Sequence, residues 1–388
     1  MSQIIPTAAQ INQTKEAINT YIRSIDSNPD RRVGAYPYYL FHAPDQPIQG
    51  TVLIFHGFSA KPHQTWRLAD YLFRNGFNVY QPSLAGHVYI NPARTWPQID
   101  LKPEIANPLK AKVQQDPVLR NYLTNVSSKA EGFTHPGFNQ RLALIARLIK
   151  IEPRLLDIVQ SIERPNDPDF DKYFDSSHRD YLLNAEARLN ELTAIPGPIY
   201  TVGLSVGGAV ALGLAGARPD RVKRVVAYAP LLQIFGEDNL KYINLAGPLD
   251  IKESGWDPNL QFPVGCLTAT NRFGSREVQS KESIQSLKNI PLFLVLTANE
   301  DAADIKTNQD FFAKVGGEAS GKKYFIYERD MLVPHPVIDP TEVSQNMSNR
   351  YWKSLYQETL RFLTEGDVDY NNLTNVEENS DLPSVPSL

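Results

Sequence analysis

The chain has 388 residues, a length that predicts two or three structural units. Hydrophobic residues make up 42% and charged residues 21%, as in ordinary globular proteins, so the chain can bury a sizeable core. Its formal net charge is −4. This weak acidity argues against a nucleic acid or an anionic membrane as a partner, because either would require a basic patch.

The chain contains one cysteine, Cys266, which cannot form a disulfide within the molecule. Residues 1–14 lack the basic start and apolar run of a secretory signal. We therefore expect a cytoplasmic protein.

Strand and helix patterns alternate along the chain. An amphipathic helix is expected within residues 1–30, and later helices at 63–74, 180–192, 207–217 and 351–362. Apolar, β-rich runs predict strands at 38–42, 51–55, 77–80, 199–202, 222–229, 292–297 and 324–327. This alternation is typical of a parallel α/β sheet.

Residues 192–217 carry no charge and are long enough to span a bilayer. However, Pro196, Gly197 and Pro198 interrupt the start of this stretch, and six glycines lie between residues 197 and 216. We interpret it as a buried strand, a tight turn and a small-residue helix, without a transmembrane segment.

The predicted domains are a discontinuous core, an inserted cap and a tail. The core comprises residues 1–87 and 181–365. Residues 88–180 form the cap, with a proline-dotted irregular part followed by helices near 139–150 and 153–162. Residues 366–388 are acidic and polar, and we expect this tail to be disordered.

The sequence Gly203-Leu-Ser205-Val206-Gly207-Gly lies directly between a predicted strand and a predicted helix. This G-x-S-x-G pattern is typical of a nucleophile elbow, in which a strained turn lifts the serine above the carboxyl end of the sheet. A dinucleotide-binding loop is the alternative, but Ser205 stands where that loop needs its middle glycine.

The remaining catalytic candidates follow from chain order. His335 is the only histidine after Ser205, and in this arrangement the acid lies between them. Asp301, after the strand at 292–297, is our choice for the acid, with Asp304 and Glu300 as alternatives.

An oxyanion hole completes the expected site. It requires two backbone N–H groups, one just after the nucleophile and one in the loop after an earlier strand. We expect these donors to be Val206 and Phe58.

These motifs, with Leu53-Ile-Phe-His56-Gly-Phe58 and Val333-Pro-His335-Pro, resemble a serine α/β-hydrolase. The similarity is greatest to bacterial carboxylesterases and monoacylglycerol lipases. It implies a mostly parallel eight-stranded sheet flanked by helices, and a triad of Ser205, Asp301 and His335. The chain departs from the family's pattern in its long insertion before the elbow and in the loop at residues 83–88, where many relatives carry an Asp together with Gly-His-Gly.

The resemblance implies hydrolysis of a carboxylic ester, small or lipid-like, through an acyl-enzyme on Ser205. A thioesterase or acyltransferase would use the same triad, and a non-catalytic small-ligand-binding homologue is a third possibility. The histidines show no metal-ligand spacing, so we expect no metal and no cofactor. The cap helices are expected to favour substrates with an apolar acyl chain. The sequence leaves the oligomeric state open.

Overall fold

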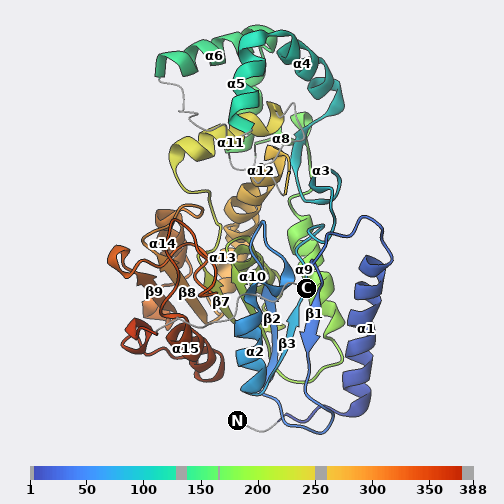
Figure 1. Ribbon diagram of the computed structural model, residues 1–388, viewed down its shortest axis with the longest axis vertical. Helices are drawn as coiled ribbons and strands as arrows, with labels where there is room; N and C mark the ends of the chain where they lie inside the picture. Colours follow the sequence, from blue (N-terminus) through green and yellow to red (C-terminus); the bar gives the residue numbers. More distant parts are fainter. Residues whose placement is uncertain (1–3, 128–137, 165–166, 250–259, 378–388) are drawn as a thin grey trace. The chain divides into compact units, whose positions relative to one another are not determined.

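The computed structural model describes residues 4–127, 138–164, 167–249 and 260–377. The chain divides into two compact units, which are drawn in sequence colours in Figure 1. The first unit comprises Met1–Ile90, Asp180–Phe235 and Phe273–Leu388, and the second comprises Asn91–Arg179 and Gly236–Arg272. The second unit thus takes in residues 236–272 as well as nearly all of the expected insertion at 88–180.

A seven-stranded sheet organises the described part of the first unit, with the strand order β1-β3-β2-β6-β7-β8-β9. Only the pairing of β1 with β3 is antiparallel. The mostly parallel α/β sheet is confirmed, with one strand fewer among the described residues than the expected eight. The strands are β1 (Tyr38–Leu40), β2 (Gly50–Phe55), β3 (Phe77–Gln81), β6 (Ile199–Leu204), β7 (Val222–Tyr228), β8 (Leu292–Thr297) and β9 (Lys323–Tyr327).

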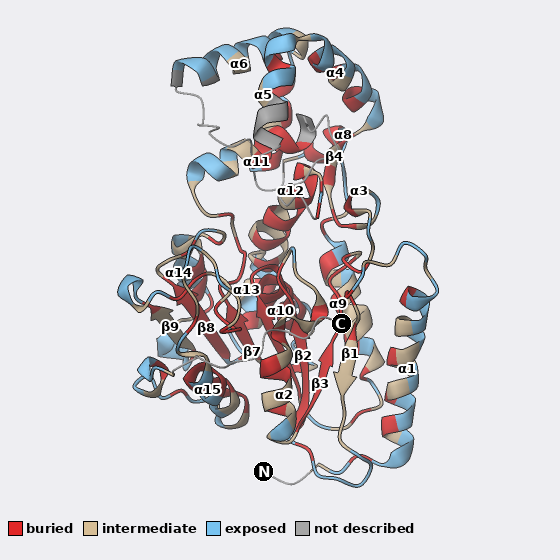
Figure 2. Ribbon diagram, in the orientation of Figure 1, coloured by how far each residue is buried: buried red, intermediate tan, exposed pale blue. Residues whose placement is uncertain are grey.

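The sheet strands are apolar because helices and loops cover both of their faces. Every residue of β2, β6 and β8 is buried, and Figure 2 shows β2 and β8 in the colour of buried residues. The helices of this unit are α1 (Ala8–Asp26), α2 (Trp66–Arg74), α9 (Asp180–Glu191), α10 (Val206–Ala217), α13 (Lys281–Leu287), α14 (Ile305–Lys314) and α15 (Trp352–Glu365). Short helical segments are η1 (Pro62–Thr65), the π-helix η2 (Phe273–Val278), η3 (Glu318–Ser320), η4 (Arg329–Met331) and η5 (Asn372–Thr374).

The uncharged stretch at 192–217 forms β6, a turn and α10. All residues of α10 from Val206 to Gly216 are buried against the sheet and neighbouring helices, which explains their small, apolar character. Among the helices in the described parts of the chain, none combines the length and apolar composition needed to cross a bilayer.

The second unit is mainly helical and has its own apolar core, to which α4, α6, α7 and α12 contribute. Its elements are α3 (Pro92–Thr95), β4 (Ile99–Leu101), α4 (Pro103–Gln115), α5 (Pro117–Ser127), α6 (Phe138–Ile151), α7 (Leu155–Glu163), α8 (Phe170–Tyr173), β5 (Phe174–Ser176), α11 (Glu237–Leu249) and α12 (Val264–Arg272).

The proline-dotted segment, expected to be irregular, is largely helical. Pro92, Pro103 and Pro117 are each the first residue of a helix. Proline is well suited to that position because its fixed φ matches the helix and its missing N–H has no partner there in any case. These three prolines therefore mark helix starts, whereas Pro108 lies inside α4, which continues past it.

Part of the expected disordered tail is packed onto the first unit. Val368 and Leu373 belong to the main core cluster, and Leu373 is fully buried. The backbone N–H of Asp369 donates to Glu358 of α15. The prediction is therefore wrong for residues 366–377, while residues 378–388 lie outside the described residues.

Candidate active site

Ser205 occupies the sharp turn between β6 and α10, with φ 56° and ψ −121°. A non-glycine residue adopts this backbone conformation only at a cost, so its neighbours must permit it. A Cβ atom on Gly203 would lie 2.0 Å from the carbonyl oxygen of Gly207, and one on Gly207 would lie 2.2 Å from that of Phe55. Both glycines of the motif are thus required by close backbone approach.

The Ser205 backbone is tied to the adjacent strand β7 and the loop after it. Its N–H donates to the carbonyl of Tyr228 at 2.9 Å, and its own carbonyl accepts the N–H of Leu231 at 2.9 Å. These bonds hold the turn at the carboxyl edge of the parallel sheet, where ligands of open α/β folds bind.

His335 follows β9, and its ring Nδ1 contacts the carboxylate of Glu300, which follows β8. The Glu300 side chain is 2% exposed and the His335 side chain 14% exposed. Glu300 Oε1 also accepts the N–H groups of Ala302 and Ala303 at 3.1 and 3.0 Å. The carboxylate is therefore fixed from two sides, and it fixes the ring in turn.

The structure places our first choice for the acid, Asp301, differently. Its carboxylate accepts a hydrogen bond from the Gln345 side chain at 2.7 Å in an exposed position. Asp304 is the N-cap of α14, where its side chain accepts the N–H of Thr307 at 2.7 Å. Of the three acidic candidates named from the sequence, Glu300 is the one whose carboxylate directly contacts the His335 ring.

Electrostatics strengthen this pair. Burial alone would lower the pKa of His335, but the negative charge of Glu300, with smaller contributions from Asp301 and Glu342, raises that pKa above its ordinary value. Burial alone would raise the pKa of Glu300, but His335 and the two backbone N–H donors lower it. The geometry therefore favours an ionised Glu300 that stabilises a protonated His335.

The loop after β2, which carries the expected oxyanion donor Phe58 N–H, approaches the nucleophile at Gly57. A Cβ atom on Gly57 would lie 3.8 Å from Ser205 Cβ. The ring Nδ1 of His56 donates to the carbonyl of Gly57 at 2.8 Å, while its Nε2 accepts the N–H of Leu84 at 3.1 Å. Burial lowers the pKa of His56 to about 3, so the ring is neutral.

This contact sets the direction of the expected donor. The Gly57 carbonyl and the Phe58 N–H belong to one trans peptide unit and point in opposite directions. By holding the carbonyl, His56 fixes the Phe58 N–H. The second expected donor is the N–H of Val206. Val206 is the first residue of α10, where backbone N–H groups have no partner within the helix.

Gln64 and Glu342 also belong to this region, and neither was identified from the sequence. The Gln64 side chain accepts the Gly57 N–H at 2.7 Å and donates to Glu342 at 3.1 Å. Glu342 and Gln64 are 278 residues apart in sequence, so no local motif signals their contact.

Glu300, Asp301 and His335 each offer one potential metal-ligand atom within 4.8 Å of the others. Glu300 already accepts two backbone hydrogen bonds and contacts the histidine ring directly. We therefore interpret the cluster as a histidine–carboxylate pair.

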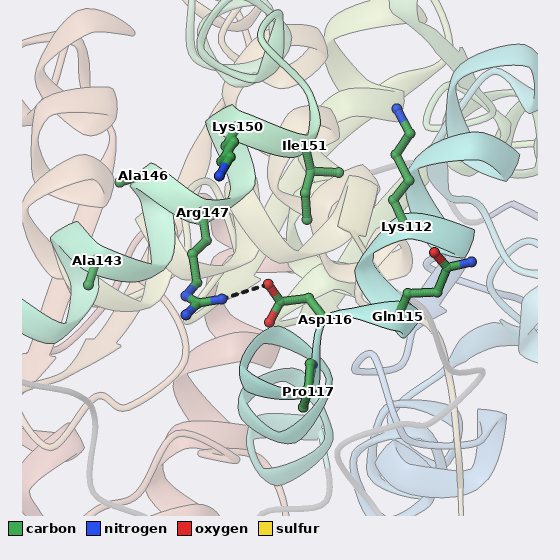
Figure 3. A pocket seen from close by; sticks show the side chains of 9 residues that line it. All are labelled: Lys112, Gln115, Asp116, Pro117, Ala143, Ala146, Arg147, Lys150 and Ile151. Atoms are coloured by element: carbon green, nitrogen blue, oxygen red, sulfur yellow. Dashed lines mark hydrogen bonds and ion pairs between the residues drawn. The ribbon is translucent and has the colours of Figure 1, made fainter.

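A large pocket lies within the second unit, on α4 and α6 and the turn before α5 (Figure 3). Its volume is about 800 Å³. Among its charged lining residues, Arg147 is paired with Asp116 at 2.8 Å. Its described lining includes no residue of the Ser205 site and no serine, threonine or cysteine.

Comparison with known proteins identifies the family. The model of the α/β hydrolase fold family matches residues 50–253, more than half of the chain. The match spans β2, the loop carrying Phe58, and the elbow at Ser205. The chain therefore belongs to the α/β hydrolase fold family.

Solved structures with a similar chain course include three lipolytic proteins. A metagenome-derived lipolytic enzyme is 14% identical, with 86% of this chain and 99% of that chain covered and a TM-score of 0.48. A Saccharomyces cerevisiae monoglyceride lipase is 15% identical, with 88% of this chain and 98% of that chain covered and a TM-score of 0.47. The Paleococcus ferrophilus monoacylglycerol lipase is 12% identical, with 86% of this chain and 99% of that chain covered and a TM-score of 0.45. A search of the curated proteins found no match.

Proposed function

We propose that this protein is a serine hydrolase that cleaves a carboxylic ester through an acyl-enzyme on Ser205. The observation that carries the proposal is the buried contact between Glu300 and His335 at the sheet edge where the strained Ser205 turn projects. A nucleophile, a base and an acid that orients the base are the groups that this chemistry requires.

In the proposed reaction His335 Nε2 takes the hydroxyl proton as Ser205 Oγ attacks the ester carbonyl. Glu300 holds the ring through Nδ1, which keeps Nε2 in the acceptor tautomer, and stabilises the imidazolium that forms. The proton then passes from Nε2 to the leaving alcohol as the acyl–oxygen bond breaks. Water, deprotonated by the same nitrogen, releases the carboxylic acid and restores Ser205.

The oxyanion of each tetrahedral intermediate is stabilised by the backbone N–H groups of Phe58 and Val206. Such donors act strongly because they are already oriented before the negative charge develops. The His56 contact to the Gly57 carbonyl supports this assignment for Phe58, and the α10 N-terminus supports it for Val206.

The proposed substrate is a small or lipid-like ester, with the second unit acting as the cap that selects an apolar acyl chain. A series of p-nitrophenyl esters of increasing acyl length tests this part. We expect kcat/KM to rise with chain length, and a flat series would contradict a role in chain selection. Matched thioesters, and oxygen esters with an added alcohol acceptor, would reveal a thioesterase or acyltransferase.

Intact mass after incubation with a fluorophosphonate tests the nucleophile. We expect a single adduct on the wild-type chain and none on Ser205→Ala. Ser24→Ala, an exposed serine on α1, is the matched control and should still be labelled. Wild-type esterase activity retained in Ser205→Ala would overturn the proposed function.

A further inference from the structure

Two side-chain contacts join η1 and the start of α2 to the loop that follows His335. Gln64 donates to Glu342 at 3.1 Å, and Arg67 pairs with Asp339 at 3.2 Å. Gln64 and Arg67 are three residues apart, as are Asp339 and Glu342, so the two contacts are neighbours that connect the same two segments. The Arg67–Asp339 pair is buried, and it anchors the segments next to the Gln64 contact.

The loop carrying His335 is also held rigidly at other points. The hydroxyl of Tyr356 in α15 donates to the Ile338 carbonyl at 2.9 Å, and the Asn349 side chain donates to the Val337 carbonyl at 2.5 Å. Asp339 accepts both the N–H and the hydroxyl of Thr341. Glu342 is therefore presented to Gln64 from a fixed backbone.

The chemistry of the three groups determines which way the Gln64 amide faces. The Gly57 N–H can only donate, so it requires the amide oxygen. An ionised Glu342 can only accept, so it requires the amide NH₂. One amide satisfies both in a single orientation, and Glu342 thereby selects the orientation that holds Gly57.

The two peptide units flanking Gly57 are thus fixed by different side chains. Gln64 holds the N–H on one side of Gly57, and His56 holds the carbonyl on the other. Since the Gly57 carbonyl shares its peptide unit with the Phe58 N–H, rotation at Gly57 would turn the proposed oxyanion donor away from the reaction centre.

We propose that Gln64 is a positioning residue that couples the His335 loop to the oxyanion loop. Its amide, held in one orientation by Glu342, keeps Gly57, and hence the Phe58 N–H, in the geometry that the tetrahedral intermediate needs. This inference rests on the proposed function and adds a residue to it. The residue acts through backbone geometry and contributes neither a proton nor a nucleophile.

Glu342 gives the coupling a pH signature. Its carboxyl group faces Gln64 of η1, and Asp339 and His335 of its own loop act on it electrostatically, with Arg67 of α2 paired to Asp339. Burial raises the pKa of Glu342 to about 7, with Asp339 adding to the rise and Gln64 and His335 opposing it. A change at position 64 therefore has consequences that depend on the protonation of Glu342.

The first test removes both hydrogen bonds at nearly constant volume, with Gln64→Met. We expect kcat to fall about tenfold with KM little changed, less than the roughly 10²- to 10³-fold cost of deleting an oxyanion donor. Hydrogen exchange of the Gly57 amide should become faster in the same variant. Thermal unfolding confirms that the variant is folded.

The second test uses charge. In Gln64→Glu, two carboxylates face each other at about pH 8.5 and repel, whereas at about pH 6 they share a proton and the bridge can form again. We expect the ratio of the variant's kcat to that of the wild type to rise as the pH falls. The double variant Gln64→Glu/Glu342→Gln restores one acceptor for Gly57 and one donor between the side chains. It should recover kcat at both pH values.

Gln309→Glu, on the exposed face of α14, is the matched control and should leave the pH profile unchanged. A folded Gln64→Met with wild-type kcat and wild-type Gly57 exchange would overturn the coupling, as would a folded double variant that fails to recover. Ser205→Ala keeps the two proposals apart. It should abolish turnover while leaving Gly57 exchange as in the wild type.

Discussion

His335 has two ring nitrogens, and Nδ1 is taken by the carboxylate of Glu300. A histidine used in this way presents Nε2 for proton transfer, and its usefulness depends on the acid that fixes the tautomer. Glu300 and Asp301 are consecutive residues, and either could be the acid by position in the sequence. Replacing each carboxylate in turn with its amide shows which of the two acts on His335.

We expect Glu300→Gln to lower kcat about 10⁴-fold, as an amide in that position favours the wrong histidine tautomer. Asp301→Asn, the matched control one residue away, should lower kcat by no more than about threefold, because its carboxylate bonds Gln345 in solvent. Steady-state kinetics with a soluble ester measure both. The opposite order of effects would assign the acid to Asp301.

Residues of the site can be predicted from sequence where a motif carries them. The elbow around Ser205 and the position of His335 follow from spacing and chain order, and the loop holding the acid can be located as well. The choice of the acid within that loop is beyond the sequence, because it depends on the path of the turn. The Asn299 N–H donates to Thr297 Oγ1, and Glu300 caps the N–H groups of Ala302 and Ala303. These bonds turn Glu300 inward and leave Asp301 outside.

At the scale of the element, the elbow is a strained turn wedged between β6 and α10. The turn requires glycine at position 207, because a Cβ atom there would collide with the backbone of Phe55 at the end of β2. Neighbouring Gly208 is less constrained. A Cβ atom there would lie 3.0 Å from the ring of Pro230 and 3.1 Å from the carbonyl oxygen of Gly203.

We expect Gly207→Ala to cost about 3 kcal/mol or more of unfolding free energy, because a buried backbone contact must be displaced. Gly208→Ala should cost at most about 1 kcal/mol of unfolding free energy. The higher helix propensity of alanine offsets part of the cost of the tight contact that its Cβ atom makes. Urea unfolding followed by circular dichroism measures both. Equal losses would show that the close approach at Gly207 does not constrain the turn.

The helix and strand patterns of the first unit are predictable because period and burial agree there. The second unit is harder to predict, since proline, which interrupts a helix in its interior, here begins α3, α4 and α5. Whether a proline starts or stops a helix depends on the residues after it. In the segment before residue 138, apolar positions after the prolines pack on a separate core.

At the scale of the whole molecule, the segment after α15 that contains Asp367 and Leu373 packs onto the first unit. Leu373 lies fully buried in the main core cluster, and Lys323 of β9 pairs with Asp367 at 2.5 Å. Composition could not reveal this packing, because a few apolar side chains among acidic ones are enough to dock a segment on α15.

We expect Leu373→Ala to destabilise the protein by about 2–4 kcal/mol, since it leaves a cavity in the core. Val376→Ala is the matched control. This side chain is 50% exposed, and its loss should change stability by less than about 0.5 kcal/mol. Chemical denaturation distinguishes the two. A Leu373→Ala protein as stable as the wild type would show that the segment is not docked in solution.

β4 and β5 lie near the two ends of the segment inserted between β3 and β6. Their antiparallel pairing places Ile99 opposite Ser176, so the two ends of this segment lie side by side. This matters for synthesis on the ribosome, which releases β2 long before its neighbour β6. An insertion that pairs its own ends while translation continues brings the two halves of the sheet within reach of each other. The saving in loop-closure free energy is only about 0.6 kcal/mol for each halving of the loop. The consequence therefore concerns the order of events: β4 and β5 can pair before β6 is synthesised, whereas the apolar core of the second unit is complete only once α12, which follows β6 and β7 in the chain, has been added.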